Sequence, residues 1–117
     1  MLTCQTYEMN GVLIIAFEDN GVALDDRQSS LRETLYRSIE SHTDGRFALD
    51  FSAINYMASS DIGFLITLRR RIDGRKGKLV LFEVDPYIVD ALRTMKLLSF
   101  FTIAETRADA LVYLAAD

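Results

Sequence analysis

The sequence predicts a single α/β domain over residues 1–117, with a mostly parallel β-sheet that opens on an N-terminal β-hairpin. An Asn-Gly dipeptide at residues 10–11 is a strong signal for a two-residue hairpin after an expected edge strand at residues 2–9. Segments of helical periodicity then alternate with short apolar segments, which indicates parallel strand pairing. Three of the apolar segments are nearly uninterrupted and are predicted to be strands buried on both faces: residues 12–17, 47–51 and 78–82.

The composition restricts the classes of function. The 117 residues carry a net charge of −4, which argues against a nucleic-acid-binding surface. The apolar segments are too short to span a bilayer, and no charged segment precedes a signal-like apolar run. Cys4 is the only cysteine, which excludes an internal disulfide and suits a reducing compartment. We therefore expect a cytoplasmic protein whose partners include neither nucleic acid nor a membrane.

The first helix is expected after a turn at residues 18–21. Asp25 is placed at its N-cap, and a turn that ends at Gly45 closes it. The strand at residues 47–51 follows and leads into the central segment of the chain. The helix itself is recognised by apolar residues that recur every four positions, at Leu31, Leu35 and Ile39.

A second helix is expected from Ser60 to Ile72. It contains Gly63, and glycine in a helix interior costs about 1 kcal/mol relative to alanine. The sequence therefore predicts that Gly63 is present because it permits close packing of this helix against the sheet.

The C-terminal third alternates strands with helices. After a strand at residues 78–83, Asp85 is expected to cap a helix whose first position is Pro86. A short strand at residues 101–103 precedes Thr106, which begins a sequence similar to a capping box. The last helix is predicted to turn four apolar residues toward the core: Ala108, Leu111, Val112 and Ala115.

Two adjacent serines, Ser59 and Ser60, stand at the start of the predicted second helix. The first backbone N–H groups of a helix and the positive end of its dipole favour an anion or a phosphoserine. The residues alone leave two interpretations open. Both serines act as N-cap groups while Asp61 interacts with the dipole, or Ser60 caps the helix and Ser59 is exposed as a phosphate acceptor.

The sequence does not predict an enzyme. His42 is the only histidine and is expected on the surface, so no Ser-His pair is indicated. A lone cysteine and a lone histidine exclude metal sites rich in these residues, and the glycines form no phosphate-binding loop. We therefore expect no catalytic residue, no metal and no cofactor.

The central segment resembles STAS domains, the family of the anti-sigma-factor antagonists. The family pattern runs Asp-x-Ser, a short apolar loop, Asp-Ser-Ser-Gly and an apolar helix. Asp50 and Ser52 match its first part, and the serine pair matches its second. The chain departs from the pattern at Ala58, where the family has an acidic residue, and at Asp61, where it has glycine. The order of elements agrees over nearly the whole chain, which implies a sheet with helices mainly on one face.

This resemblance implies an anti-sigma-factor antagonist that binds an anti-sigma factor that is also a serine kinase. Phosphorylation at Ser59, or at Ser60 as second choice, would break the complex, and ATP would bind to the partner. A serine phosphatase is an additional implied partner. The alternative is a sensor module of similar fold that binds a small ligand or nucleotide. The residues expected at the partner-binding surface are Asp25, Asp50, Ser52, Ala58, Ser59, Ser60 and Asp61.

Overall fold

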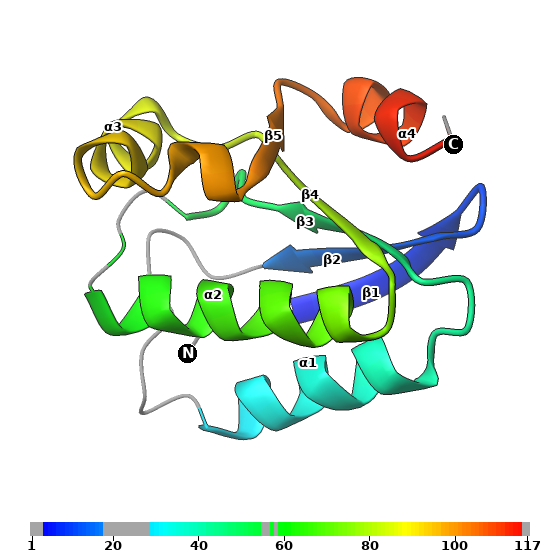
Figure 1. The fold of residues 1–117 in the computed structure, drawn as a ribbon. Coiled ribbons are helices and arrows are strands. Elements are labelled where there is room, and N and C mark those ends of the chain that lie inside the picture. The colour runs from blue at the N-terminus through cyan, green and yellow to red at the C-terminus, as the bar shows by residue number, and fades with distance from the viewer. Residues whose placement is uncertain (1–3, 18–28, 55–56, 58, 116–117) are drawn as a thin grey trace.

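The computed structural model describes residues 4–17, 29–54, 57 and 59–115. Five strands, four α-helices and one short 3-10 helix are found in these residues (Figure 1). In chain order they are β1 (Cys4–Met9), β2 (Val12–Phe17), α1 (Ser29–Ser41), β3 (Arg46–Asp50), α2 (Ser59–Gly74), β4 (Lys78–Phe82), α3 (Pro86–Thr94), the 3-10 helix η1 (Leu98–Phe100), β5 (Thr102–Ala104) and α4 (Arg107–Ala115).

The strands form one sheet in the order β1-β2-β3-β4-β5. β1 pairs antiparallel with β2, and every other neighbouring pair is parallel. The three apolar segments are thus adjacent central strands, as predicted. β3 buries Phe47, Ala48 and Leu49 in succession, which shows that it is covered on both faces.

The hairpin turn between β1 and β2 also confirms the sequence prediction. Met9 pairs with Val12, so the loop has two residues. These are Asn10 and Gly11, with φ angles of 56° and 81°. Two positive φ angles are the requirement of a type I′ turn, which the Asn-Gly dipeptide meets at low steric cost.

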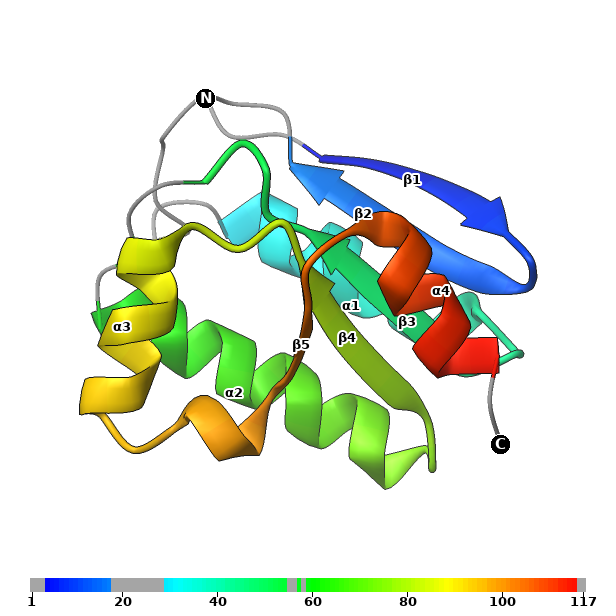
Figure 2. The ribbon, with the colours of Figure 1, turned by 90° about the horizontal axis from the view of Figure 1, so that it is seen from above.

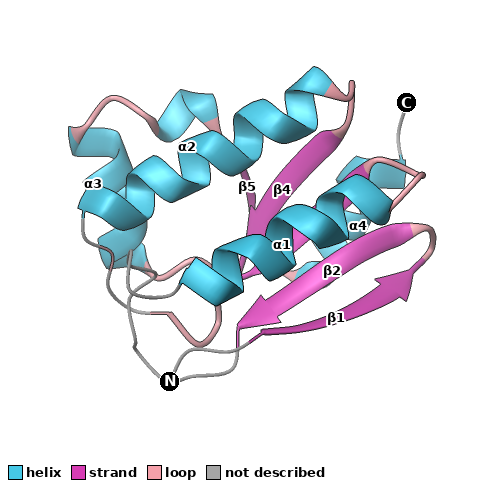
Figure 3. Cartoon of the chain, turned by 90° about the horizontal axis from the view of Figure 1, so that it is seen from below, coloured by secondary structure: helices cyan, strands magenta, loops and turns pink. Residues whose placement is uncertain are grey.

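Helices cover both faces of the sheet, but unequally (Figures 2 and 3). α1 and α2 lie on one face, where the larger core forms around Leu35, Leu65, Leu68 and Phe47. α3 adds Ile88 and Leu92 to the same core. α4 alone packs on the other face, over a smaller core.

The inward face of α4 differs from the prediction. Its buried residues are Ala110 and Leu114, whereas Val112 is 71% exposed. Ala108 and Ala115 are exposed as well, and Leu111 is half-buried. Since apolar residues surround most of this short helix, periodicity alone did not identify the side that meets Val80 and Phe82 of β4.

The helix caps in the C-terminal third are confirmed. The carboxylate of Asp85 accepts the backbone N–H of Tyr87 at 2.9 Å, and Pro86 is the first residue of α3. The hydroxyl of Thr106 accepts the backbone N–H of Asp109 at 3.2 Å at the start of α4. The predicted cap Asp25 lies outside the described residues.

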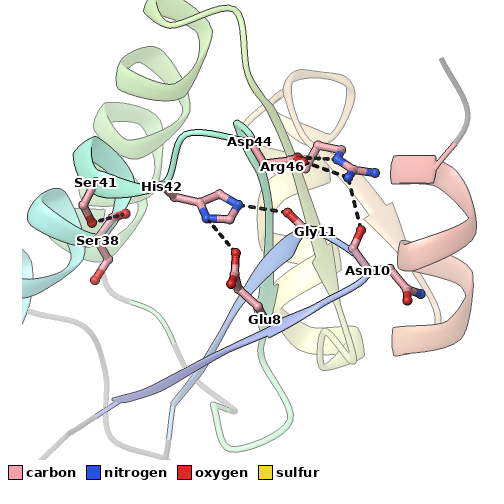
Figure 4. A network of polar contacts seen from close by, with 8 residues as sticks. All are labelled: Glu8, Asn10, Gly11, Ser38, Ser41, His42, Asp44 and Arg46. Carbon is pink, nitrogen blue, oxygen red and sulfur yellow. Dashed lines mark hydrogen bonds and ion pairs between the residues drawn. The ribbon is translucent and has the colours of Figure 1, made fainter.

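A polar network joins the hairpin turn to the α1–β3 turn (Figure 4), and a hydrogen bond from Arg46 extends it to the end of α4. His42 is 8% exposed, so the prediction of a surface histidine is wrong. Its Nε2 lies 3.0 Å from the carbonyl oxygen of Gly11, and its Nδ1 lies 3.3 Å from a carboxylate oxygen of Glu8. The histidine was mistaken for a surface group because its partners come from β1 and its turn, which are distant in sequence.

Arg46 completes this network. Its guanidinium donates to the carbonyl oxygens of Asn10, at 3.1 Å, and of Leu114, at 3.3 Å, and it pairs with Asp44. The hydrogen bond from Arg46 holds the pKa of the Asp44 carboxyl below its usual value. One side chain therefore fixes the hairpin and the C-terminal end of α4 to the start of β3.

Gly63 and Gly77 differ in how much space surrounds them. Gly63 is exposed, and a Cβ built on it would meet nothing within 4 Å, so the predicted close packing against the sheet is wrong. Gly77 is closely packed against backbone, because its Cβ would lie 2.5 Å from the carbonyl oxygen of Gly45. The same oxygen accepts the backbone N–H of Lys78 at 2.8 Å, which holds the α1–β3 and α2–β4 turns together.

We predict opposite effects of alanine at these two glycines. Gly63→Ala should stabilise the domain by about 1 kcal/mol, since alanine is the better helix former and has free space. Gly77→Ala should destabilise it by about 1–3 kcal/mol, as expected for overpacking against backbone. Urea unfolding of both variants measures this, and a less stable Gly63→Ala variant would contradict the open environment of α2.

Candidate functional site

The carboxyl ends of the parallel strands lie along one edge of the sheet. β3 ends at Asp50, β4 at Phe82 and β5 at Ala104, and these residues are neighbours in the ladder. The chain leaves this edge from β3 through a loop to the N-terminus of α2 (Figure 1). Ligands of open α/β sheets bind at such an edge, which makes this edge the candidate site of the domain.

Asp50 and Ser52 shape the start of the loop after β3. The carboxylate of Asp50 accepts the backbone N–H of Ser52 at 2.9 Å, which closes a local turn. Phe51 donates its backbone N–H to the carbonyl oxygen of Phe82 at 3.0 Å, and its side chain is buried. The structure thus brings the predicted site residues Asp50 and Ser52 together. Ser52 is exposed, and the neighbouring Phe51 is buried in the core.

The serine pair opens α2. The helix begins at Ser59, one residue earlier than predicted, so Ser59, Ser60 and Asp61 all lie in its first turn. The backbone N–H groups of a first helical turn have no intrahelical acceptor and attract negative charge. Two other predicted site residues, Ala58 and Asp25, lie outside the described residues.

Asp61 lies in the first turn of α2, as expected, but not on the surface where the sequence analysis expected it to meet a partner. It is the acidic residue in the first turn of α2, and it is fully buried, with 0% of its surface exposed. Its carboxylate is therefore out of reach of a partner and does not present a negative charge on the surface. Its position instead puts a polar group inside the domain directly after the two serines.

A groove with a volume of about 510 Å³ runs beside α4, and we call it the α4 groove. Asp50 and Ser52 contribute to it, as do residues of β1, β4 and α4. The sequence does not identify these residues, because they are distant along the chain and are brought together only by the fold. The full lining is Met9, Asp50, Ser52, Phe82, Glu83, Thr106, Arg107, Ala108 and Leu111.

The described part of the chain contains neither a candidate metal site nor a candidate membrane-spanning helix. Its His, Cys, Asp and Glu residues include no group of three or more that could hold a metal ion. Within the same residues, no helix is both long and apolar enough to cross a membrane.

Comparison with known proteins identifies the fold. A family model described as STAS domain matches residues 6–110. The anti-sigma-factor antagonist (STAS) domain protein of Planctomyces limnophilus has a TM-score of 0.86 and 19% identity, covering 97% of this chain and 99% of that one. No curated protein matches the chain.

Two structures of SpoIIAA are also similar. The anti-sigma factor antagonist SpoIIAA in its unphosphorylated form has a TM-score of 0.76 and 16% identity, covering 98% of each chain. The Bacillus cell fate determinant SpoIIAA in the phosphorylated form has a TM-score of 0.68 and 17% identity, covering 95% of this chain and 98% of that one. At such identities the likeness shows the fold alone.

We predict that the role of Asp50 in its turn depends on the side-chain oxygen and not on its charge. Asp50→Asn retains an acceptor for the Ser52 N–H and should unfold close to the wild type, whereas Asp50→Ala should lose about 1 kcal/mol. Denaturant unfolding of both variants is the measurement. An equal loss in the two variants would show that the charge stabilises the loop.

Proposed function

The chain belongs to the STAS domain family, and we propose that it is an anti-sigma-factor antagonist that binds an anti-sigma factor with serine kinase activity. In this proposal, phosphorylation of Ser59 dissociates the complex, and a serine phosphatase restores it. The observation that carries the proposal is the serine pair in the first turn of α2. It is supported by the similarity to SpoIIAA, of which unphosphorylated and phosphorylated forms are known.

The position of the serines provides a physical reason for the switch. A phosphate adds about −1.5 to −2 charge at neutral pH. Free backbone N–H groups at a helix N-terminus accommodate such a charge as long as it is solvated. Across an interface, burying an unpaired charge costs about 2–5 kcal/mol of binding energy. The same phosphate that the isolated domain accommodates therefore opposes the complex.

The surface proposed to meet the partner combines the first turn of α2 with the turn after β3. Ser52 is exposed and Asp50 half-buried, so both are accessible at the edge of the sheet. Ser59 is the first choice for the modified residue because it begins the helix and stands nearest to the loop; Ser60 is the second. In this proposal the ATP site lies on the partner kinase, so no nucleotide site is required in this chain.

The switch predicts a clear order of affinities for the partner captured from the native host. Ser59→Asp should weaken binding by about 30-fold or more, because each 1.4 kcal/mol is tenfold. Ser59→Ala should bind and should no longer be released by ATP. Calorimetric titration of the wild type and both variants gives these affinities.

The control for an added charge is Ser99→Asp, because Ser99 is exposed in η1, away from the start of α2. This variant should bind like the wild type. Phosphosite mapping after incubation with partner and ATP identifies the modified residue. Phosphate found only on Ser60 would reassign the switch to that residue, and its absence from both serines would exclude the proposed mechanism.

The burial of Asp61 generates a second prediction. A charge introduced at Ser59 lies two residues before this carboxylate in the first turn of α2, and a like charge nearby disfavours the ionised form of a buried carboxylate. Ser59→Asp should therefore cost more stability in the wild type than in an Asp61→Asn background. Coupled neighbouring positions typically differ from additivity by about 0.5–3 kcal/mol.

Denaturant unfolding of the wild type, the two single variants and the double variant measures this coupling. Ser99→Asp combined with Asp61→Asn is the matched control and should be additive. Equal costs of Ser59→Asp in both backgrounds would refute the interaction with Asp61.

A further inference from the structure

The α4 groove combines a polar end with apolar walls. At the polar end, Asp50 and Glu83 follow one another across two neighbouring strands, since Asp50 pairs with Phe82 and Glu83 is the next residue. Met9, Phe82 and Leu111 contribute the apolar lining. A volume of about 510 Å³ lies within the range of about 300–1,000 Å³ that is typical of ligand sites.

The two carboxylates retain capacity to accept hydrogen bonds. Asp50 uses one oxygen for the Ser52 N–H, and neither it nor Glu83 forms an ion pair in the part of the chain that the structure describes. Arg107 is the only cation among the lining residues. Its guanidinium donates to the hydroxyl of Tyr7 at 3.2 Å, which directs it toward β1.

Glu83 is one of four non-glycine residues with a positive φ angle in the described part of the chain. Its φ angle is 56°, in the left-handed region that favours glycine. Its backbone N–H donates to the carbonyl oxygen of Glu105 at 3.3 Å, and its side chain is exposed. Such conformations are enriched at binding sites, where the surrounding structure maintains them. Here the conformation keeps a carboxylate at the end of β4 where glycine would be the easier residue.

We propose that the α4 groove binds a guanidinium or ammonium group carried on an apolar stem. The cation lies between Asp50 and Glu83, and the stem lies along Met9 and Leu111. A guanidinium suits this place because it is planar, weakly hydrated and able to bridge two carboxylates. The same chemistry has two sources, a free amine or an arginine or lysine side chain of a bound protein. Only the second source rests on the function proposed above.

Binding of the cation is tested with butylguanidinium and its neutral isostere butylurea. Amide chemical shifts of the 15N-labelled domain should change saturably with butylguanidinium near Ser52, Glu83 and Leu111, and butylurea should bind at least about tenfold more weakly, equivalent to 1.4 kcal/mol. Glu83→Gln should weaken butylguanidinium binding by a similar factor. Asp50→Asn, which retains the turn, is a second variant with the same expected loss.

The matched control is Glu105→Gln, because Glu105 is an exposed acid of the same edge that does not line the α4 groove. It should bind the probe like the wild type. Equal binding of the two probes, an undiminished affinity in Glu83→Gln, or shifts located elsewhere would overturn the proposal.

A second titration separates the two sources. If a side chain of the partner occupies the groove, butylguanidinium should compete with the captured partner, and Glu83→Gln should weaken the complex while the serines are still phosphorylated at saturating partner concentration. If butylguanidinium binds the groove, but neither butylguanidinium nor Glu83→Gln changes the affinity for the captured partner, the occupant is a free amine. Binding of butylguanidinium does not require phosphorylation of the serines. The experiment therefore distinguishes failure of the groove proposal from failure of the phosphorylation switch.

Discussion

The burial of β3 on both faces is the constraint on which the rest of the domain depends. Along this strand, Phe47 and Leu49 belong to the core under α1 and α2, whereas Ala48 belongs to the core under α4. Helices are therefore required on both sides of the sheet, as for any doubly covered strand. Asp50 is the first residue of the strand after these buried positions, and its side chain follows Ala48 onto the α4 side. The candidate site begins where the burial of β3 ends.

The two ends of the sheet differ in how fully their polar groups are paired. At the amino end, Arg46 donates to two backbone carbonyl oxygens and pairs with Asp44, while His42 lies between Gly11 and Glu8. These bonds fix several turns and leave little capacity for a ligand. At the carboxyl end lie the carboxylates of Asp50 and Glu83, the α4 groove and the start of α2. A rigid amino end that supports an open carboxyl end is a physical basis for recognition.

The sequence predicted those features that depend on local chemistry. The hairpin follows from Asn10-Gly11, the caps from Asp85 and Thr106, and the central strands from continuous apolar segments. Features that depend on distant residues were not predictable. The environments of His42 and Gly63 and the inward side of α4 are set by the tertiary arrangement, and the α4 groove collects residues from β1 to α4. Of the residues that line this groove, only Asp50 and Ser52 were predicted from the sequence as site residues, and they were predicted for a partner-binding surface.

Asp61 changes the electrostatics of the proposed switch. Relative to the family pattern, the acidic residue has moved from before the serine pair to after it, and the structure buries it in the first turn of α2. Two unit charges 4 Å apart interact by about 1 kcal/mol in water and by about 4 kcal/mol at the lower effective dielectric near a protein surface. If the Asp61 carboxyl is ionised, a phosphate in this turn would meet a like charge as well as the favourable N–H groups. Phosphorylation would then act on the stability of the turn itself, so the proposed partner would sense its conformation together with its charge.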